Sequence, residues 1–342
     1  MKKTGKVRLS DVAKAAGVSS GTVSNTINRP DSVSEATRRK VLAAIRQLDF
    51  VPNEGAATLR SGTSKLLGLV VPDVTSSFYA EIAKGVARRA EMVGYAMLLF
   101  NTDDDPDREA RQLETLARHR SIGALIVPRL ADEQRLARLR QLGMHLVLID
   151  RATSEHDGCS VSIDDVRGGF LAGQHLVGLG RKRLAFVDGP RGVPQAGRRL
   201  DGFRSALTAG GRTSQDCVEV HVENASYAGG QEAARILLAR ATLPDGVFCV
   251  NDQMAIGLLN SLVHAGVEVP DRIAVVGYGD SAVAQSAVLP LTTVHQPMIE
   301  LGSAAVDLLL AEADGSRGDH SHSSTVFKPK IVVRESAPPV AP

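Results

Sequence analysis

Two sets of polar residues in this sequence could recognise a ligand, and each suits a different kind of partner. The first set lies near the N-terminus and consists of small, uncharged residues, most with hydrogen-bonding side chains: Ser19, Ser20, Gly21, Thr22, Ser24, Asn25 and Asn28. Hydroxyl groups can bond to DNA phosphates, and Ser or Asn side chains can reach base edges in the major groove. This set therefore suits double-stranded DNA.

The second set stands just beyond a series of apolar runs: Asp73, Asn101, Asp150, Arg151, Asp188, Asn251, Asp252 and Asp280. Carboxylates, amides and an arginine supply the paired acceptors and donors that a polyhydroxylated ligand needs, and Phe78 or Tyr79 could stack on a sugar face. Any one of these polar residues could instead cap a helix or close a turn. For Asp188 and Asp252 we consider that structural role at least as good an interpretation.

Two short helices around a tight turn must position the first set. The spacing predicts a helix over 11–16 capped by Ser10, a break at Gly17, and a second helix over 20–28 capped by Ser19. Their apolar residues meet on one inner side, which leaves the polar residues of the second helix outward. Taken alone, this pattern also fits a plain helical hairpin with a polar surface.

A third amphipathic helix is expected to follow, with Ser34 as its cap. Its apolar stripe is Val41, Leu42, Ile45 and Leu48. Residues 1–62 contain 11 Lys and Arg against 5 Asp and Glu, a net charge of +6, whereas the whole chain carries +2. A basic headpiece on a mildly acidic body is typical of a nucleic-acid-binding protein, and a solvated helix bundle would not explain this asymmetry.

From residue 66 onward, apolar strand-like runs alternate with helical stretches. The runs are LLGLVV, YAMLLF, ALIV, LVLI, LAFVD, VFCV and IAVV. Nearly continuous apolar strands separated by helices predict parallel sheets that are covered on both faces. The pattern repeats with a division near 163, which indicates two similar lobes. In such folds ligands bind beyond the carboxyl ends of the strands, where the second polar set lies.

Composition and length limit the classes to which the protein can belong. The 342 residues fit a globular protein of more than one domain, and the basic N-terminus MKKTGKVRLSD has no apolar segment typical of a signal peptide. No apolar run approaches the roughly 20 residues that span a bilayer, so we expect a cytoplasmic protein without a membrane partner. Three distant cysteines without metal-ligand spacing indicate buried, reduced thiols. They are Cys159, Cys217 and Cys249.

Enzyme and metal signatures are missing from the sequence. It has no GxGxxG after a strand, no GxxxxGK[ST], no GxSxG and no His/Glu metal spacing. The DHSH segment at 319–322 lies in a Gly/Ser/His-rich loop, a composition that indicates disorder rather than a metal site. We therefore expect no catalytic residues, no metal and no cofactor other than a small-molecule effector.

Several motifs, in order along the chain, resemble those of the LacI/GalR family of bacterial transcription regulators. They are VSSGTVSNTINRPDSVSEATRRKV at 18–41, FVPN at 50–53, VPDVTSSFYAEI at 71–82, NDQMAIG at 251–257 and PLTTVHQP at 290–297. The resemblance covers nearly the whole chain. It implies an all-α helix-turn-helix headpiece and a two-lobed, periplasmic-binding-protein-like α/β core built on two doubly wound parallel sheets.

The resemblance also implies domain boundaries and three crossings of the chain between the lobes. The expected ranges are a headpiece at 1–52, a hinge helix at 53–63, and a core at 64–342 with an N-lobe (about 64–162 and 295–325) and a C-lobe (about 163–294 and 326–342). The hinge is expected to become helical on operator DNA, to pair with its partner and to insert Leu59 into the minor groove. Many relatives have Arg where Ala57 stands, so we expect weaker minor-groove binding. Ser10 completes the candidate DNA contacts.

Family positions that commonly touch the effector match seven residues of this chain: Asp73, Phe78, Asp150, Arg151, Arg199, Asn251 and Gln296. Gly279 departs from the pattern, because many sugar-binding relatives have Asp directly after GY; Asp280 could substitute from a different direction. Arg151 and Val193 stand where purine-binding relatives carry an aromatic residue and an arginine. A purine effector is therefore disfavoured.

The best hypothesis is a dimeric, sequence-specific repressor of carbohydrate-utilisation genes whose operator affinity is switched allosterically by a sugar-like effector. The C-terminal ESAPPVAP offers no leucine heptads, which favours a homodimer over the tetramer of some relatives. A solute-binding protein without a DNA role is the alternative, although the missing export signal and the basic headpiece count against it. A sugar-modifying enzyme is poorly supported by these residues.

Overall fold

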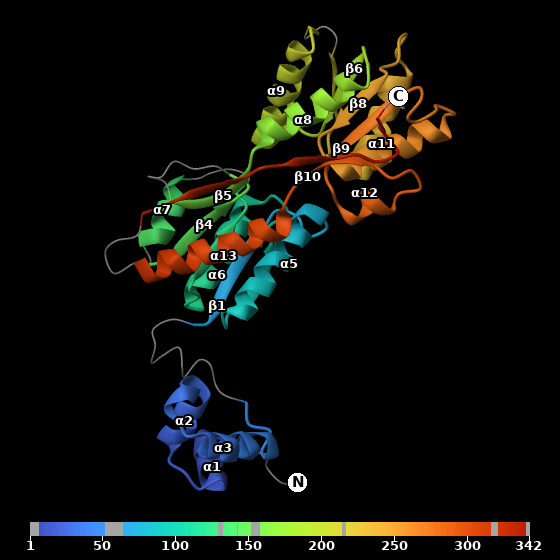
Figure 1. Ribbon diagram of the computed structural model, residues 1–342. Helices are drawn as coiled ribbons and strands as arrows, with labels where there is room; N and C mark the ends of the chain where they lie inside the picture. The colour runs from blue at the N-terminus through green and yellow to red at the C-terminus, as the bar shows by residue number, and fades with distance from the viewer. Residues whose placement is uncertain are drawn as a thin grey trace. The chain divides into compact units, whose positions relative to one another are not determined.

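The computed structural model describes residues 7–51, 64–128, 133–141, 143–151, 158–213, 217–315 and 321–339. The chain divides into two compact units, Met1–Ser64 and Lys65–Pro342. The first is helical and the second is an α/β core (Figure 1). None of the helices in the described ranges is long and apolar enough to cross a bilayer.

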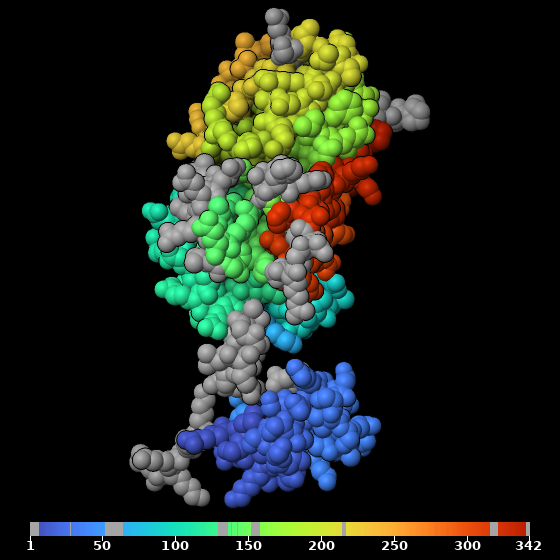
Figure 2. Space-filling model, turned by 90° about the vertical axis from the view of Figure 1, so that its left-hand side faces the viewer, coloured from blue at the N-terminus to red at the C-terminus, as the bar shows by residue number. Residues whose placement is uncertain are grey.

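Across residues 7–51, the headpiece consists of three helices and one 3-10 turn: α1 (Leu9–Ala16), α2 (Ser20–Asn28), η1 (Pro30–Ser32) and α3 (Glu35–Gln47). In the space-filling view of Figure 2 they form one continuous body of atoms (blue). Their shared core is small and consists of Val12, Ala13, Val23, Val41, Ala44 and Phe50. Ser19 and Ser34 cap α2 and α3 as predicted, by accepting hydrogen bonds from Thr22 N and Thr37 N.

Two headpiece predictions were wrong. Ser10 does not cap α1; the helix begins two residues earlier than predicted, and Asp11 accepts a hydrogen bond from the backbone N–H of the N-cap residue, Arg8, at 2.8 Å. A carboxylate three residues into the helix can satisfy that N–H better than a hydroxyl inside the first turn, so the start shifts. Leu42 is 39% exposed and lies outside the apolar stripe that buries Val41.

The first sheet of the core has the strand order β11-β5-β4-β3-β1-β2, and all its strands are parallel. Its strands are β1 (Leu66–Val71), β2 (Ala96–Asn101), β3 (Gly123–Ile126), β4 (His145–Ile149), β5 (Cys159–Ile163) and β11 (Ser324–Phe327). The covering helices are α5 (Ser77–Met92), α6 (Pro106–Arg118), α7 (Glu133–Gln141) and α13 (Met298–Gly315). Apolar side chains of α5 and α13 pack with one face, and those of α6 and α7 with the other.

The second sheet has the order β12-β10-β9-β8-β6-β7 and is parallel except for the edge pair β10–β12. Its strands are β6 (Leu184–Asp188), β7 (Cys217–His221), β8 (Gly246–Cys249), β9 (Ala274–Gly279), β10 (Thr292–His295) and β12 (Lys330–Val332). Its helices are α8 (Asp165–Gly178), α9 (Pro194–Ala209), α10 (Tyr227–Leu238), α11 (Asp252–His264) and α12 (Ala282–Ser286). The predicted two parallel-sheet lobes are confirmed.

The chain passes from one sheet to the other three times. It leaves β5 for α8 at 164, returns from β10 to α13 at 296–297, and leaves β11 for β12 at 328–329 (Figure 1). Because the strands of the first sheet all run the same way, their carboxyl ends share one edge. Asp73, Asn101 and Asp150 lie at or just beyond that edge, so the polar set gathers where the sequence predicted.

Three helix pairs of the core pack backbone against backbone through reciprocal glycines. A Cβ on Gly202 of α9 would lie 1.9 Å from the carbonyl oxygen of Val166 on α8, and one on Gly169 of α8 would lie 1.9 Å from that of Arg199 on α9. The pairs α10/α11 and α5/α13 repeat the arrangement through Gly230 with Gly257 and Gly85 with Gly302. No other residue type fits at these contacts without separating the helices.

Candidate functional site

A buried cationic side chain organises the C-lobe side of the candidate effector site. Arg199, in the second turn of α9, is only 9% exposed. Its Nε donates to Oδ1 of Asp165 at 2.8 Å, its Nη1 donates to the carbonyl of Val250 at 2.9 Å, and its Cζ lies 3.8 Å from the centre of the Tyr278 ring. The hydroxyl of Tyr278 also donates to Oδ1 of Asp165, at 3.2 Å.

This cluster holds the guanidinium in one orientation and in its charged form. Burial acts to lower the pKa of Arg199, but the negative charge of Asp165 outweighs it and raises the pKa above its usual value. For Tyr278, burial raises the pKa, which keeps the phenol protonated. The side chains therefore form a preorganised group of fixed charge at the carboxyl edge of the second sheet.

Asp150 and Gln195 connect the two lobes. Asp150 directly follows β4 of the first sheet, and Gln195 lies in the first turn of α9 on the second. Nε2 of Gln195 donates to both the backbone carbonyl and Oδ2 of Asp150, at 2.8 and 3.0 Å. Burial, with a smaller contribution from the charge of Asp165, raises the pKa of Asp150.

Four buried oxygens near the crossing segments lack a hydrogen-bond partner among the described residues: Oδ1 of Asp150, Oγ of Ser162, Oδ2 of Asp165 and Oε1 of Gln296. Asp150 and Gln296 are the two of these that were predicted to bind the effector. An acceptor that loses water without gaining a donor costs about 1–3 kcal/mol, and more for a charged group. Such atoms are expected where a ligand supplies the missing donors. Asp150 and Gln296 thus stay predicted effector contacts.

Three other polar residues at the strand ends have their side chains engaged within the protein. Asn251 caps α11 by accepting from Met254 N, and its amide donates to the carbonyl of Ala225. The carboxylate of Asp280 pairs with Arg334 and with Nδ1 of His295.

Asp252 accepts from Ser281 N and Oγ and from Thr293 Oγ1, which agrees with the structural role considered for it. A Cβ at Gly279 would lie 2.9 Å from the carboxylate of Asp252, so the aspartate that many relatives carry at this position would crowd it. We leave Asn251 and Asp280 out of the proposed effector contacts.

The remaining candidates on the N-lobe are more open. Asp73 is exposed and accepts from the N–H and hydroxyl of Thr75. Phe78 and Tyr79 are half-buried at the start of α5, with ring centres 5.2 Å apart in an edge-to-face arrangement. Arg151 is half-buried beside Asp150. These residues stay predicted contacts that a ligand at this edge could reach.

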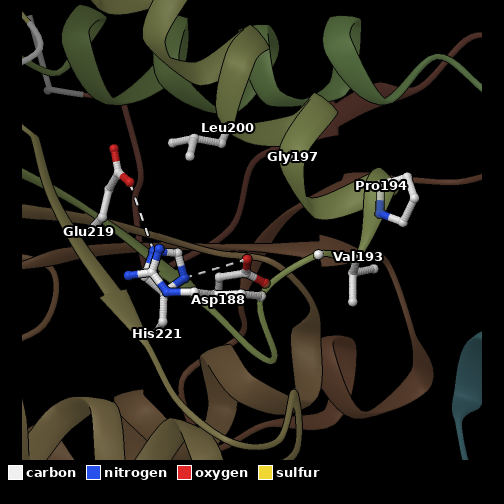
Figure 3. A pocket seen from close by; sticks show the side chains of 9 residues that line it. Asp188, Val193, Pro194, Gly197, Leu200, Glu219 and His221 are labelled. Carbon is white, nitrogen blue, oxygen red and sulfur yellow. Dashed lines mark ion pairs between the residues drawn. The ribbon is translucent and has the colours of Figure 1, made fainter.

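A cavity of about 360 Å³ lies on another face of the first turns of α9 (Figure 3). Its lining residues are Asp188, Arg191, Gly192, Val193, Pro194, Gly197, Leu200, Glu219 and His221. The His221 ring nitrogens lie 3.8 Å from carboxylate oxygens of Asp188 and Glu219. Gln195 and Arg199 do not line it, because positions 193, 197 and 200 share one side of the helix and 195 and 199 another.

The headpiece presents the predicted DNA-binding residues as expected for an outward surface. Ser20, Gly21 and Asn25 are exposed on α2, while Thr22 and Ser24 are partly covered. Ser19 uses its hydroxyl to cap the helix and is itself exposed, as is Ser10 on α1. Asn28 ends α2. The predicted hinge contacts, Ala57 and Leu59, lie outside the described residues.

Sequence reasoning missed Asp165, Gln195 and Tyr278. Asp165 looks like a first-turn helix residue, and its pairing with Arg199 depends on the close approach of α8 and α9. The only local sign for Gln195 is Pro194 before it, which marks the start of a helix at the strand-end edge. Tyr278 sits within an apolar run, where a hydroxyl is expected to need a partner.

Together, the basic helix-turn-helix unit and the two-lobed core with a polar edge define a DNA-binding regulator that carries a small-molecule receptor. The family model of bacterial regulatory proteins, lacI family, matches residues 8–53, and that of the periplasmic binding protein-like domain matches 174–337. The chain belongs to the LacI family of bacterial transcriptional regulators, and the headpiece match decides against a solute-binding protein without a DNA role.

Relatives and solved structures span nearly the full chain. The ribose operon repressor of Escherichia coli (strain K12) is 37% identical over 303 residues, which is 88% of this chain and 92% of that protein. The PurR repressor of Photobacterium profundum is 33% identical and covers 96% and 98% of the two chains.

Two solved structures resemble the whole architecture. The CelR–cellobiose complex (33% identity) covers 96% of this chain and 99% of its own, with a TM-score of 0.73. The Lac repressor dimer bound to operator and the anti-inducer ONPF (27% identity) covers 98% and 100%, with a TM-score of 0.84.

Proposed function

We propose that this protein is a homodimeric repressor of carbohydrate-utilisation genes, and that a sugar or sugar derivative bound between its lobes controls its affinity for operator DNA. The observation that carries the proposal is the unsatisfied Oδ1 of Asp150, buried at the junction of the lobes. The charged Arg199 cluster lies close enough to affect the ionisation of Asp150. Acceptor and donor groups thus converge at this junction.

A neutral, polyhydroxylated ligand fits these groups better than an apolar or purely anionic one. Each sugar hydroxyl can donate to Asp150 or Gln296 and accept from Arg199, so the buried polar atoms gain partners without a new uncompensated charge. An anionic ligand would have to approach the carboxylate of Asp150. The ribose operon repressor and the CelR–cellobiose complex among the similar proteins support this choice.

The contact between Gln195 and Asp150 suggests how the effector acts. A ligand hydroxyl that bonds to Asp150 competes with or reinforces the donation from Gln195, and either effect changes the relative free energies of the open and closed lobes. The movement would be passed through the N-lobe to the hinge and so to the operator. Coupling is reciprocal: an effector that weakens operator binding itself binds the operator-bound protein more weakly.

Paired headpieces would read two half-sites of a near-palindromic operator, as two-fold symmetry requires. Ser20, Gly21 and Asn25 are the exposed residues of α2 best placed to reach base edges. The basic residues of α3 would add salt-dependent attraction to phosphates. Because its proposed partner is bacterial DNA, we also place the protein in the cytoplasm.

The test combines a thermal-shift screen of sugars and sugar acids with operator binding. Full-length protein is screened first, and each hit is added to a fluorescence-anisotropy titration of DNA from its own promoter region at several salt concentrations. We expect a hit to shift both the melting temperature and the operator Kd. Asp150→Asn should lose both responses. Asp201→Asn, an exposed aspartate on the same helix as Arg199, should keep them.

Three results would overturn the proposal or part of it. Operator affinity no greater than that for scrambled duplex, with and without every hit, would remove the regulatory role. An Asp150→Asn variant that responds to the sugar as the wild type does would remove the site. A purine hit that alone changes operator binding would replace the sugar by a purine effector.

A further inference from the structure

Three metal-ligating side chains meet in the N-lobe, at the edge of the first sheet opposite the candidate effector site. They are Cys159, the first residue of β5; Glu312, in the last turn of α13; and His322, two residues before β11. One ligand atom from each lies within 4.8 Å of the others. The residues are 153 and 10 positions apart along the chain, so sequence spacing could not reveal the cluster and predicted no metal site at 319–322.

The pairing of β5 with β11 places the thiol and the imidazole. Ser160 N donates to the carbonyl of Ser323 at 3.0 Å, and Ser160 and Ser324 share a hydroxyl contact at 2.9 Å. With the strands held in this register, Sγ of Cys159 lies 3.7 Å from Nδ1 of His322. Bond lengths of roughly 2.3 Å to sulfur and 2.0–2.1 Å to nitrogen in a tetrahedron put these atoms about 3.6 Å apart, so little movement is needed.

Glu312 gives an independent indication of a bound cation. Its side chain is buried, with 7% of the residue exposed, and Oε2 accepts no hydrogen bond from the part of the chain that the structure describes. The Cys159 thiol contacts this carboxylate, but Oε2 itself lacks a partner, which is costly in a buried group, and a metal ion would satisfy it. A thiolate, a carboxylate and a neutral imidazole would together balance the charge of a divalent cation.

We infer that Cys159, Glu312 and His322 form a binding site for Zn²⁺, with a water molecule as the fourth ligand. The mixed sulfur, nitrogen and oxygen donors suit zinc and exclude magnesium or calcium, which take oxygen ligands. Binding releases the thiol proton to solvent as the sulfur–zinc bond forms.

The position of the site gives it a structural consequence. Each ligand belongs to or adjoins a different one of the three elements that carry the crossings: β5, α13 and β11. Zinc would therefore join these three elements to one another at their ends away from the crossings. We expect the ion to stiffen the N-lobe beneath the crossings and to raise the thermal stability of the core.

The experiment uses tag-free, full-length protein that is reduced, treated with chelator and freed of metal. Co²⁺ serves as the probe, because a cobalt–thiolate bond gives a charge-transfer band in the near ultraviolet. We expect one Co²⁺ per chain and displacement by Zn²⁺. Zinc at about 100 times its Kd should raise the melting temperature by about 5–10 °C.

Variants locate the site. Cys159→Ser should lose the charge-transfer band. His322→Ala and Glu312→Gln should weaken Zn²⁺ binding by more than the roughly 10–100-fold that loss of an outer-shell partner costs. Cys217→Ser and His264→Ala, the same residue types in the C-lobe, should bind as the wild type does.

The circular-dichroism spectrum of each metal-free variant verifies its fold, and His322→Ala, at a half-buried position outside a strand, provides the site test if Cys159→Ser does not fold. The proposal would be contradicted if the wild type gave no cobalt–thiolate band. It would also be contradicted if His322→Ala kept both the band and the zinc-induced rise in melting temperature.

Discussion

Replacing Gly202 by Ala should destabilise the core, whereas the same replacement at Gly197, five residues earlier in α9, should stabilise it. A Cβ on Gly202 would lie 1.9 Å from the carbonyl oxygen of Val166 and 2.8 Å from the backbone N of Phe170. A carbon–oxygen contact needs about 3.3 Å, so α8 and α9 must move apart by about 1.4 Å at this point. A Cβ on exposed Gly197 has no atom within 4 Å.

The expected free energies follow from these two environments. Alanine is favoured over glycine inside a helix by about 0.5–1 kcal/mol, and at Gly197 that gain should appear alone. At Gly202 the gain is opposed by overpacking, which costs about 1–3 kcal/mol and can exceed that where backbone must shift. We expect a net loss of about 1–2 kcal/mol at Gly202, and therefore a difference of about 1.5–3 kcal/mol between the variants.

Urea unfolding of the full-length protein measures the difference as a shift in midpoint at constant m value. A second readout is effector binding. Gly169 and Gly202 set the distance between α8 and α9, which carry Asp165 and Arg199, so Gly202→Ala should also weaken a ligand that depends on Arg199. Equal shifts in the same direction for Gly202→Ala and Gly197→Ala would refute the reasoning, because helix propensity alone would then explain both.

Three further outcomes follow from buried groups. Burial raises the pKa of Asp150 from 3.8 to about 7, so folded protein retains a proton that the unfolded chain has released between these values. As pH rises from 3.8 to about 7, the unfolding free energy of the wild type should therefore fall relative to that of Asp150→Asn, as measured by urea titrations. A difference between the two proteins that does not change with pH would contradict the raised pKa. Arg199→Met should cost about 3–5 kcal/mol by removing the closest positive charge from buried Asp165, and the double variant with Asp165→Asn should lose less than the sum of the two single losses; additive losses in the same urea titration would contradict the coupling. Val23→Ala should cost about 2 kcal/mol in the small headpiece core and weaken operator binding, while sugar-induced thermal shifts of the core stay unchanged; full operator affinity would contradict it.

Local chemistry was enough to predict most of the architecture. Ser19 and Ser34 cap helices because a hydroxyl there meets free backbone N–H groups, and the apolar runs from residue 66 form parallel strands because both of their faces are covered. The prediction for Ser10 was wrong because the carboxylate of Asp11 accepts from the backbone N–H of Arg8, so the helix begins before Ser10.

The site was harder to predict from sequence, because its geometry depends on contacts between distant segments. Arg199 and Asp150 could be predicted from family positions, but their partners could not. Asp165 reaches Arg199 only because α8 packs against α9, and Gln195 reaches Asp150 only because the two lobes meet. The same limit applies to Asp280, whose carboxylate is engaged by an arginine 54 residues later.

The reciprocal glycines decide which kinds of motion the receptor can undergo. Where the backbones of two helices touch, one helix cannot slide along the other without driving a carbonyl group into a Cα, so shear within the pairs α8/α9, α10/α11 and α5/α13 is suppressed. Each lobe must then rotate as a rigid block, and the bending falls on the few residues at 164, 296–297 and 328–329. A substitution at those connections should thus alter how far the lobes swing while leaving the interior of each lobe intact.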